Sequence, residues 1–295
     1  METISAKTIL SPKKDPSWFG TDYNMNLYKG CCHGCIYCDS RSDCYQISDF
    51  DTVRAKENAL TILATELHSK TKTGVIGTGA MSDPYNPYEA VHCLTGRALE
   101  LIDRYGFGIA IATKSSLITR DIGVLKKIKA HSPVLCKITI TCAEDELSSK
   151  LEPGVSVSSE RFQAVKILSE EGIFAGILMM PLLPNLTDTP ENILQIIHKG
   201  KECGAHFIYP MFGLTMRSGQ REYMYEKVTE LFPGKKLKDA YIRQFGANYV
   251  CNSPREKELR QIFASECSRL GILYRMDDII HSYRLEYEYR QLSLF

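Results

Sequence analysis

The chain has 295 residues, of which 44% are hydrophobic, with 36 Lys+Arg against 35 Asp+Glu. This composition excludes a disordered, collagen-like or disulfide-miniprotein chain, and the length suits one large α/β domain with an appendage. Because the net charge is close to zero, bulk charge gives no argument for or against a polyanionic partner. No apolar run approaches the ~20 residues that span a bilayer, so no membrane role is expected.

Short apolar runs alternate with amphipathic helical patterns through most of the chain, which is typical of βα units that form a parallel sheet. Six strands are predicted, at residues 24–28, 74–78, 108–113, 134–141, 173–180 and 206–210. Beyond them the sequence becomes rich in tyrosine and charged residues with helical periodicity. The expected α/β architecture is an open TIM-type barrel with a C-terminal helical extension. The predicted boundaries are a lead-in at 1–23, the barrel at 24–215 and the extension at 216–290.

The eleven cysteines are unusual for such a chain. Their odd number argues against a secreted disulfide framework and favours a reducing, cytoplasmic location. Cys31, Cys35 and Cys38 follow the first predicted strand with the spacing C-x3-C-x2-C. Thiolates are soft ligands that select iron-sulfur clusters or zinc. Three of them can bind three irons of a [4Fe-4S] cluster and leave the fourth iron open to a small molecule.

Structural zinc is the alternative, held by these three cysteines and one of His33, Cys32 or Cys44. The protein would then be a non-catalytic adaptor. Zinc sites usually present paired cysteines on separate knuckles, whereas this motif is one dense run on the first barrel loop. The spacing and the position of the motif therefore favour the cluster.

The cysteine loop resembles the hallmark of the radical SAM superfamily, whose members fold as partial (β/α)6 barrels. The resemblance implies a [4Fe-4S] cluster whose fourth iron is chelated by S-adenosylmethionine (SAM). One electron then cleaves SAM to a 5′-deoxyadenosyl radical, which abstracts a substrate hydrogen. A reductant such as flavodoxin or ferredoxin is implied as well. In such enzymes the cofactor carries the chemistry, and the protein orients it and excludes water.

Longer segments resemble the spore photoproduct lyase group and, more narrowly, radical SAM mobile pair protein B, which is usually encoded beside a second radical SAM protein. The resemblance covers about residues 20–212 and is carried by residues 5–10, 28–35, 77–89, 112–115 and 152–161. It implies a lyase-like enzyme that acts on DNA, in lesion repair or base modification. The alternative is modification of a protein, peptide or small metabolite together with the partner radical SAM protein.

The same resemblance assigns four cofactor contacts. Tyr37 is expected along the adenine or sulfonium side of SAM, Lys114 on its carboxylate, and Ser82 and Thr141 in hydrogen bonds to it. Lys114 also fits on chemical grounds, because it follows an uninterrupted apolar strand at the end where a carboxylate ligand needs a cation.

One position departs from the lyase pattern. Spore photoproduct lyase has a hydrogen-donating cysteine in the segment of the second strand, where this chain has Ala80. Cys142, directly after the fourth predicted strand, and Cys93 are the candidate hydrogen donors. Ordinary packing in the core is the alternative for both.

The sequence ends in Gln291, Leu292, Ser293, Leu294 and Phe295. This segment resembles the short peptide by which bacterial repair and replication proteins dock on the DNA sliding clamp. Leu294 and Phe295 would fill an apolar pocket while Gln291 makes polar contacts. We expect residues 291–295 to bind the clamp; the alternative is that the three apolar side chains pack on the protein's own surface.

Overall fold

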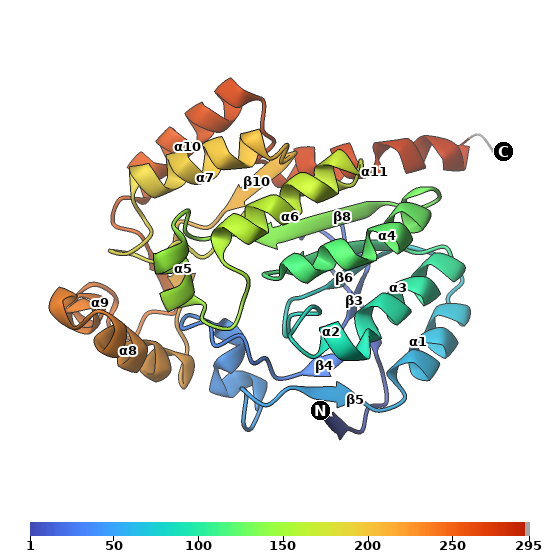
Figure 1. Cartoon of the computed structure of the whole chain (residues 1–295), viewed down its shortest axis with the longest axis horizontal. Coiled ribbons are helices and arrows are strands. Elements are labelled where there is room, and N and C mark those ends of the chain that lie inside the picture. Colours follow the sequence, from blue (N-terminus) through green and yellow to red (C-terminus); the bar gives the residue numbers. More distant parts are fainter. Residues whose placement is uncertain (293–295) are drawn as a thin grey trace.

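The computed structural model describes the backbone of residues 1–292 and the side chains of residues 1–287. Six parallel strands form its main sheet in the order β10-β9-β8-β7-β6-β3, and the short strand β2 pairs antiparallel with β3 at one edge (Figure 1). The predicted open α/β barrel is confirmed. The strands are β2 (Leu10–Pro12), β3 (Tyr23–Met25), β6 (Val75–Thr78), β7 (Gly108–Thr113), β8 (Val134–Thr139), β9 (Phe174–Met179) and β10 (Phe207–Pro210).

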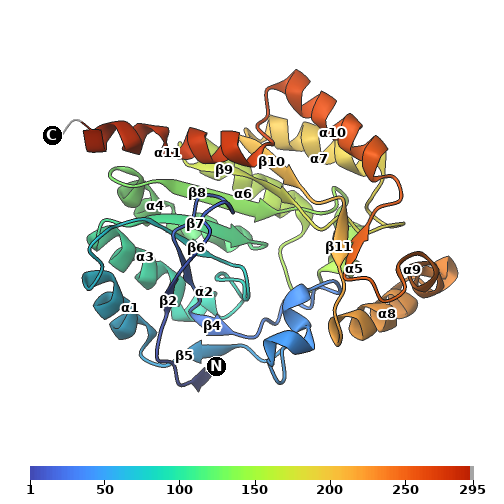
Figure 2. The same cartoon turned by 180° about the vertical axis from the view of Figure 1, so that it is seen from behind.

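Helices cover the outer face of this sheet, as the alternating sequence pattern predicts (Figures 1 and 2). Their apolar faces pack on the outward side chains of the strands, such as Ile109, Ile111 and Ile138. Helix α7 has a well-defined start, because the Thr189 hydroxyl accepts a hydrogen bond from Asn192 N and proline is the first helical residue. These helices are α1 (Ala59–His68), α2 (Glu89–His92), α3 (Leu94–Arg104), α4 (Ile122–Lys129), α5 (Asp145–Leu151), α6 (Ser158–Glu170) and α7 (Pro190–Glu202).

The predicted strand at residues 24–28 is divided between two sheets. Only its beginning, in β3, belongs to the barrel, and Tyr28 lies in β4 (Tyr28–Lys29). There Tyr28 pairs with Ala55 of β5 (Arg54–Lys56), which in turn pairs with β1 (Glu2–Ile4). The chain thus leaves the barrel immediately before the cysteine loop.

The C-terminal helices are α8 (Gln220–Leu231), α9 (Leu237–Phe245), α10 (Glu256–Leu270) and α11 (Met276–Leu292). This region also contains β12 (Val250–Asn252), which pairs with β11 (Gly213–Thr215) and was not predicted. Helix α10 lies beside α7, while α8 and α9 lie near the cysteine loop (Figure 1). Among the described helices, none combines the length and apolar character needed to cross a bilayer.

The inner face of the barrel has its own apolar cluster, built from alternate residues of the strands. Ala110, Leu135, Leu178 and Phe207 face inward, and Phe19 from the segment before β3 packs among them. Because side chains alternate along a strand, every second residue faces inward up to the carboxyl end of each strand. The site lies at these carboxyl ends.

Candidate active site

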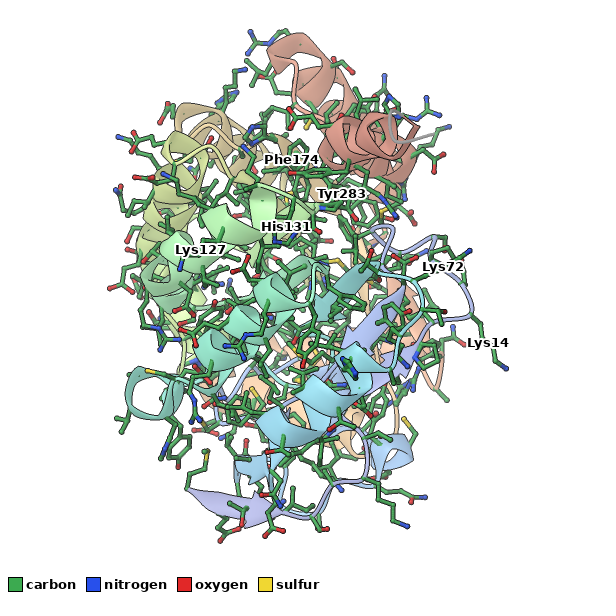
Figure 3. All side chains as sticks on the ribbon, turned by 90° about the vertical axis from the view of Figure 1, so that its right-hand side faces the viewer. Lys14, Lys72, Lys127, His131, Phe174 and Tyr283 are labelled. Carbon is green, nitrogen blue, oxygen red and sulfur yellow. The ribbon has the colours of Figure 1, made fainter. Side chains whose placement is uncertain are left out.

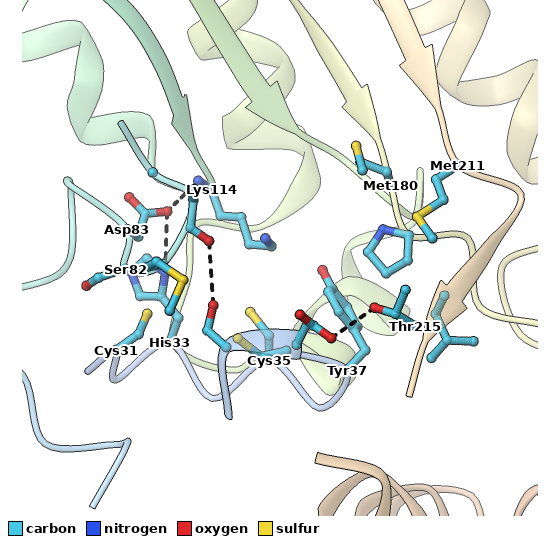
Figure 4. Close-up of a pocket in the computed structure, with 18 residues that line it drawn as sticks. Cys31, His33, Cys35, Tyr37, Ser82, Asp83, Lys114, Met180, Met211 and Thr215 are labelled. Atoms are coloured by element: carbon cyan, nitrogen blue, oxygen red, sulfur yellow. Dashed lines mark hydrogen bonds and ion pairs between the residues drawn. The ribbon is translucent and has the colours of Figure 1, made fainter. Parts of the chain in front are cut away.

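A pocket opens at the carboxyl ends of the barrel strands (Figure 4). Its wall brings together six of the predicted site residues from three separate parts of the chain: Cys31, Cys35, Tyr37, Cys38, Ser82 and Lys114. Met180 follows β9 and Met211 follows β10, and both complete the wall. This end of a parallel α/β barrel is where such folds place their chemistry.

The donor set fits a cluster better than a single metal ion. Cys31, Cys35 and Cys38 are the three cysteines among the described residues of the pocket wall. In the part of the chain that the structure describes, no three His, Cys, Asp or Glu side chains converge closely enough to hold one ion. A zinc ion needs its donors about 2.0–2.3 Å from one point, whereas each cysteine of a cluster binds a different iron. Three cysteine thiols in one pocket wall match the three protein ligands of a cluster that keeps one iron open.

The cysteine loop is held from both sides by backbone hydrogen bonds. Cys31 N donates to Phe50 O at 2.8 Å, Ile36 N to Leu151 O at 3.0 Å, and Gly154 N to His33 O at 2.9 Å. Gly30 begins the loop with φ +79°, and a Cβ atom there would collide with the backbone after Phe50. Burial raises the pKa of the Cys35 and Cys38 thiols.

A fully buried ion pair lies behind this loop. Arg161 Nη2 contacts Glu152 Oε2 at 2.5 Å, and both side chains are inaccessible to solvent. Arg161 also donates to Thr139 O at 2.7 Å and to Ser148 Oγ at 2.8 Å. The Tyr37 hydroxyl donates to Glu152. Burial opposes ionisation of Glu152, but Arg161 holds the pKa of this carboxyl below its usual range. The pair ties the loop residue Tyr37 to the end of β8.

Lys114 extends into the pocket from the end of β7. Its Nζ lies 5.7 Å from the centre of the Tyr37 ring. Burial disfavours the ammonium group, but the neighbouring Cys35, Glu152 and Asp83 together raise the pKa of Lys114. Lys114 therefore stays charged and is placed to bind an anionic group in the pocket.

Asp83 was not among the predicted site residues. Its carboxylate is buried and accepts hydrogen bonds from Thr113 Oγ1 at 2.6 Å, Tyr85 N at 2.9 Å and Lys114 N at 2.8 Å. His33 Nδ1 of the cysteine loop lies 3.6 Å from Asp83 Oδ2 (Figure 4). Asp83 therefore joins the loop after β6 to the end of β7 and to the cysteine loop.

Three predicted site residues do not line the pocket. Thr141 is fully buried, because β8 ends at Thr139 and the chain then passes inside the fold. The buried Cys142 thiol contacts Glu144 O at 3.5 Å, and Cys93 is the left-handed cap of α2, 3.6 Å from Arg120 Nη1. Neither thiol lines the pocket, so hydrogen donation by Cys142 or Cys93 stays a prediction.

The predicted clamp-binding segment lies almost wholly outside the described residues. Helix α11 includes the backbone of Gln291 and Leu292. Their side chains, and Leu294 and Phe295 altogether, are outside what the structure describes, so clamp binding stays a prediction.

Residues 25–197, more than half of the chain, match the radical SAM superfamily domain. The chain belongs to the radical SAM superfamily. The [4Fe-4S] cluster and SAM, predicted from the cysteine motif and the resemblance, are the cofactors of this superfamily.

Two relatives of this radical SAM protein extend the match. It is 30% identical over 259 residues to an uncharacterized protein of Methanocaldococcus jannaschii, covering 87% of this chain and 93% of that protein. It is 28% identical over 206 residues to an uncharacterized protein of Mycobacterium tuberculosis, covering 68% of this chain and 60% of that one. The chain therefore spans about three fifths of the length of the mycobacterial relative.

The fold is similar to solved radical SAM structures. Spore photoproduct lyase complexed with dinucleoside spore photoproduct superposes with a TM-score of 0.64 at 14% identity, covering 90% of this chain and 78% of the lyase. The methyltransferase TsrM of Kitasatospora setae, with tryptophan substrate and a SAM analogue, gives 0.54 at 12% identity, covering 84% and 51%. The resemblance to the spore photoproduct lyase group is confirmed at the level of the fold. The narrower resemblance to mobile pair protein B stays a prediction.

Proposed function

We propose that this radical SAM enzyme acts on DNA, abstracting a hydrogen atom in a lesion-repair or base-modification reaction. The observation that carries the proposal is the convergence of Cys31, Cys35, Cys38 and Lys114 on one pocket in a fold similar to that of spore photoproduct lyase. A solved structure of that lyase contains both AdoMet and a dinucleoside photoproduct. Membership of the superfamily does not determine the substrate. We infer DNA from the similarity of the fold to that of spore photoproduct lyase.

The residues of the pocket have separate roles in this proposal. When bound, the cluster and SAM supply one-electron cleavage and hydrogen abstraction. Lys114 binds the SAM carboxylate, and Tyr37 offers its ring face, because its hydroxyl is used by Glu152. The Ser82 hydroxyl donates to Gly30 O at 2.6 Å, so it holds the start of the cysteine loop and keeps only its acceptor capacity for SAM. Met180 and Met211 provide an apolar wall that excludes water.

Lys114→Met is expected to weaken SAM binding by about 10- to 100-fold, because one charge-assisted hydrogen bond is lost. Iron content should stay unchanged, since Lys114 is not a predicted cluster ligand. The matched control is Lys126→Met, which removes an exposed lysine paired with Glu171 on the outer surface. Equilibrium dialysis with labelled SAM measures the effect. Equal SAM affinities for wild type and Lys114→Met would overturn the assignment of Lys114.

Isotope transfer tests the choice of DNA as substrate. The reduced enzyme is supplied with SAM and a deuterium-labelled oligodeoxynucleotide, or with a labelled peptide in a parallel reaction. Mass spectrometry of the 5′-deoxyadenosine is expected to show deuterium from DNA. Deuterium from the peptide alone would support the alternative, modification of a protein or peptide with a partner radical SAM protein.

We also propose that residues 291–295 bring the enzyme to DNA through the sliding clamp. The support is the resemblance of this pentapeptide to clamp-docking peptides and the small net charge, +1, which gives no bulk attraction to DNA. The full chain and a chain lacking residues 291–295 are compared for binding to purified clamp. Unchanged affinity after the deletion would contradict the proposal.

A further inference from the structure

The segment from Lys13 to Asp22 crosses the open side of the barrel. Its end is fixed at β6, where Asp22 N donates to Val75 O at 2.8 Å. In its middle, the ring of Phe19 lies 5.4 Å from Tyr209 and 5.9 Å from Phe207, both on β10. Since β10 and β3 lie at opposite ends of the row of parallel strands, this segment spans the gap between them.

Lys137 points into the barrel beneath this segment. Its neighbours on β8, Cys136 and Ile138, face the helices, so the alternation of the strand turns Lys137 inward. Its side chain is 4% exposed, and its Nζ lies 4.6 Å from the centre of the Phe19 ring. Among the described residues, no carboxylate or hydrogen-bond acceptor partners this ammonium group. A buried, unpaired lysine is costly to stability and points to a ligand that would pair with it.

A second lysine lies close to the first. Lys13 Nζ donates to Thr21 Oγ1 at 2.8 Å, and its charge acts directly on Lys137. The two nearest carboxylates have other partners, because Asp15 accepts from Ser17 N and Asp22 from Val75 N, both at 2.8 Å. The next residue, Lys14, is exposed and points away from the molecule (Figure 3).

Aromatic rings connect these lysines to the pocket. Trp18, 42% exposed, lies 5.5 Å from Tyr209 in an edge-on arrangement. Tyr209 is half-buried on the inner face of β10, one inward position before Met211 of the pocket wall. An accessible aromatic ring beside lysine ammonium groups is the combination that binds single nucleic acid strands, through base stacking and phosphate contacts.

We propose that Lys13 and Lys137 bind a phosphate group and that Trp18 and Tyr209 contact the attached base, so that a single DNA strand or extruded nucleotide reaches the pocket along the open side of the barrel. This inference rests on the proposed action on DNA, whose substrate it makes specific. An acidic peptide could pair with the two lysines but has no base to contact Trp18 and Tyr209. The site therefore distinguishes a DNA substrate from an acidic peptide substrate.

The chain contains a single tryptophan, so Trp18 fluorescence reports directly on this site. The full-length protein is titrated with a short single-stranded oligodeoxynucleotide, a thymidine mononucleotide, inorganic phosphate and a polyglutamate peptide. Quenching by the oligonucleotide, with weaker binding of the mononucleotide and still weaker binding of phosphate, is expected. Quenching by the peptide at equal or higher affinity would overturn the inference.

Lysine variants distinguish binding at this specific site from general electrostatic attraction between the protein and DNA. Lys137→Met and Lys13→Gln are each expected to lower oligonucleotide affinity by about tenfold or more. Lys14→Gln removes the same charge as Lys13→Gln from the adjacent, outward position and is expected to change affinity less than twofold. Equal effects of the two glutamine substitutions, or full affinity of Lys137→Met, would overturn the site while leaving DNA as the substrate. Lysine-dependent binding of the mononucleotide, without binding of the oligonucleotide, would support the phosphate site and contradict DNA.

The stability of Lys137→Met shows that lost binding is not lost folding. Burial and, to a smaller extent, the charge of nearby Lys13 lower the pKa of Lys137 to about 7, although the Cys136 thiol opposes this shift. From about pH 7 to about pH 10 the unfolded chain holds a proton on Lys137 that the folded chain has released, so wild-type stability rises with pH there. Lys137→Met should lack this rise and melt at a higher temperature at pH 7. A lower melting temperature would contradict the unpaired state of Lys137.

Discussion

Cys35→Ala is expected to abolish binding of the iron-sulfur cluster. Cys35 is buried in the pocket wall with Cys31 and Cys38. A cluster with one open iron has only three protein ligands, so it is not retained when one of them is removed. Wild type should contain about four irons per chain after anaerobic reconstitution, and Cys35→Ala should contain far less. Iron and acid-labile sulfide analysis, together with the brown absorbance of the cluster, measures the difference.

Cys32→Ala is the matched control for this change. Cys32 lies in the same loop but does not line the pocket, and it packs against the main core instead. The Cys32→Ala variant should keep the cluster. Equal loss of iron in both variants would mean that the loop, rather than the individual thiol, was damaged. Full iron content in Cys35→Ala would contradict the ligand assignment.

Arg161→Met is expected to destabilise the fold by about 3–5 kcal/mol, because it leaves Glu152 charged, buried and unpaired. Glu152 belongs to the segment that closes over the cysteine loop, so loss of its partner should also loosen the hold on Tyr37. Urea denaturation of the purified protein gives the change in the free energy of unfolding.

The double variant Arg161→Met with Glu152→Gln is expected to be more stable than Arg161→Met alone, since it removes the orphaned charge. The buried ion pair would be contradicted if Arg161→Met changed the free energy of unfolding by less than about 0.5 kcal/mol. It would also be contradicted if the effects of Arg161→Met and Glu152→Gln, each measured alone, simply added in the double variant. The comparison separates the cost of an unpaired charge from the loss of packing.

The sequence was sufficient to predict the barrel and part of its site. Apolar strands buried on both faces have a strong local pattern, so β7 at Gly108–Thr113 has the predicted bounds. The three cysteines are seven positions apart at most, and Lys114 directly follows a strand, so both signals are local. The strand predicted to end at Thr141 ends at Thr139 instead, because the apolar pattern continues two residues beyond the end of β8.

The contacts that join the site residues to one another are not encoded by any local pattern. Tyr37 and Glu152 are 115 positions apart, and Asp83 meets Lys114 only because β6 and β7 are neighbours in the sheet. Glu152 and Arg161 were noticed only as part of a family resemblance, since a charged pair in a sequence is more often exposed than buried. For Lys137, the alternation of β8 was a usable signal, because it turns a lysine inward between Leu135 and Thr139.

Formation of 5′-deoxyadenosine tests most directly whether the pocket of Cys31, Cys35, Cys38 and Lys114 is a SAM-cleaving centre. The anaerobically reconstituted wild-type protein is reduced, given SAM, and its products are separated and quantified by mass spectrometry. Wild type and Cys32→Ala should form 5′-deoxyadenosine, and Cys35→Ala should form none. A wild-type preparation with a full complement of iron and sulfide that forms no 5′-deoxyadenosine, or undiminished formation by Cys35→Ala, would contradict this function of the pocket.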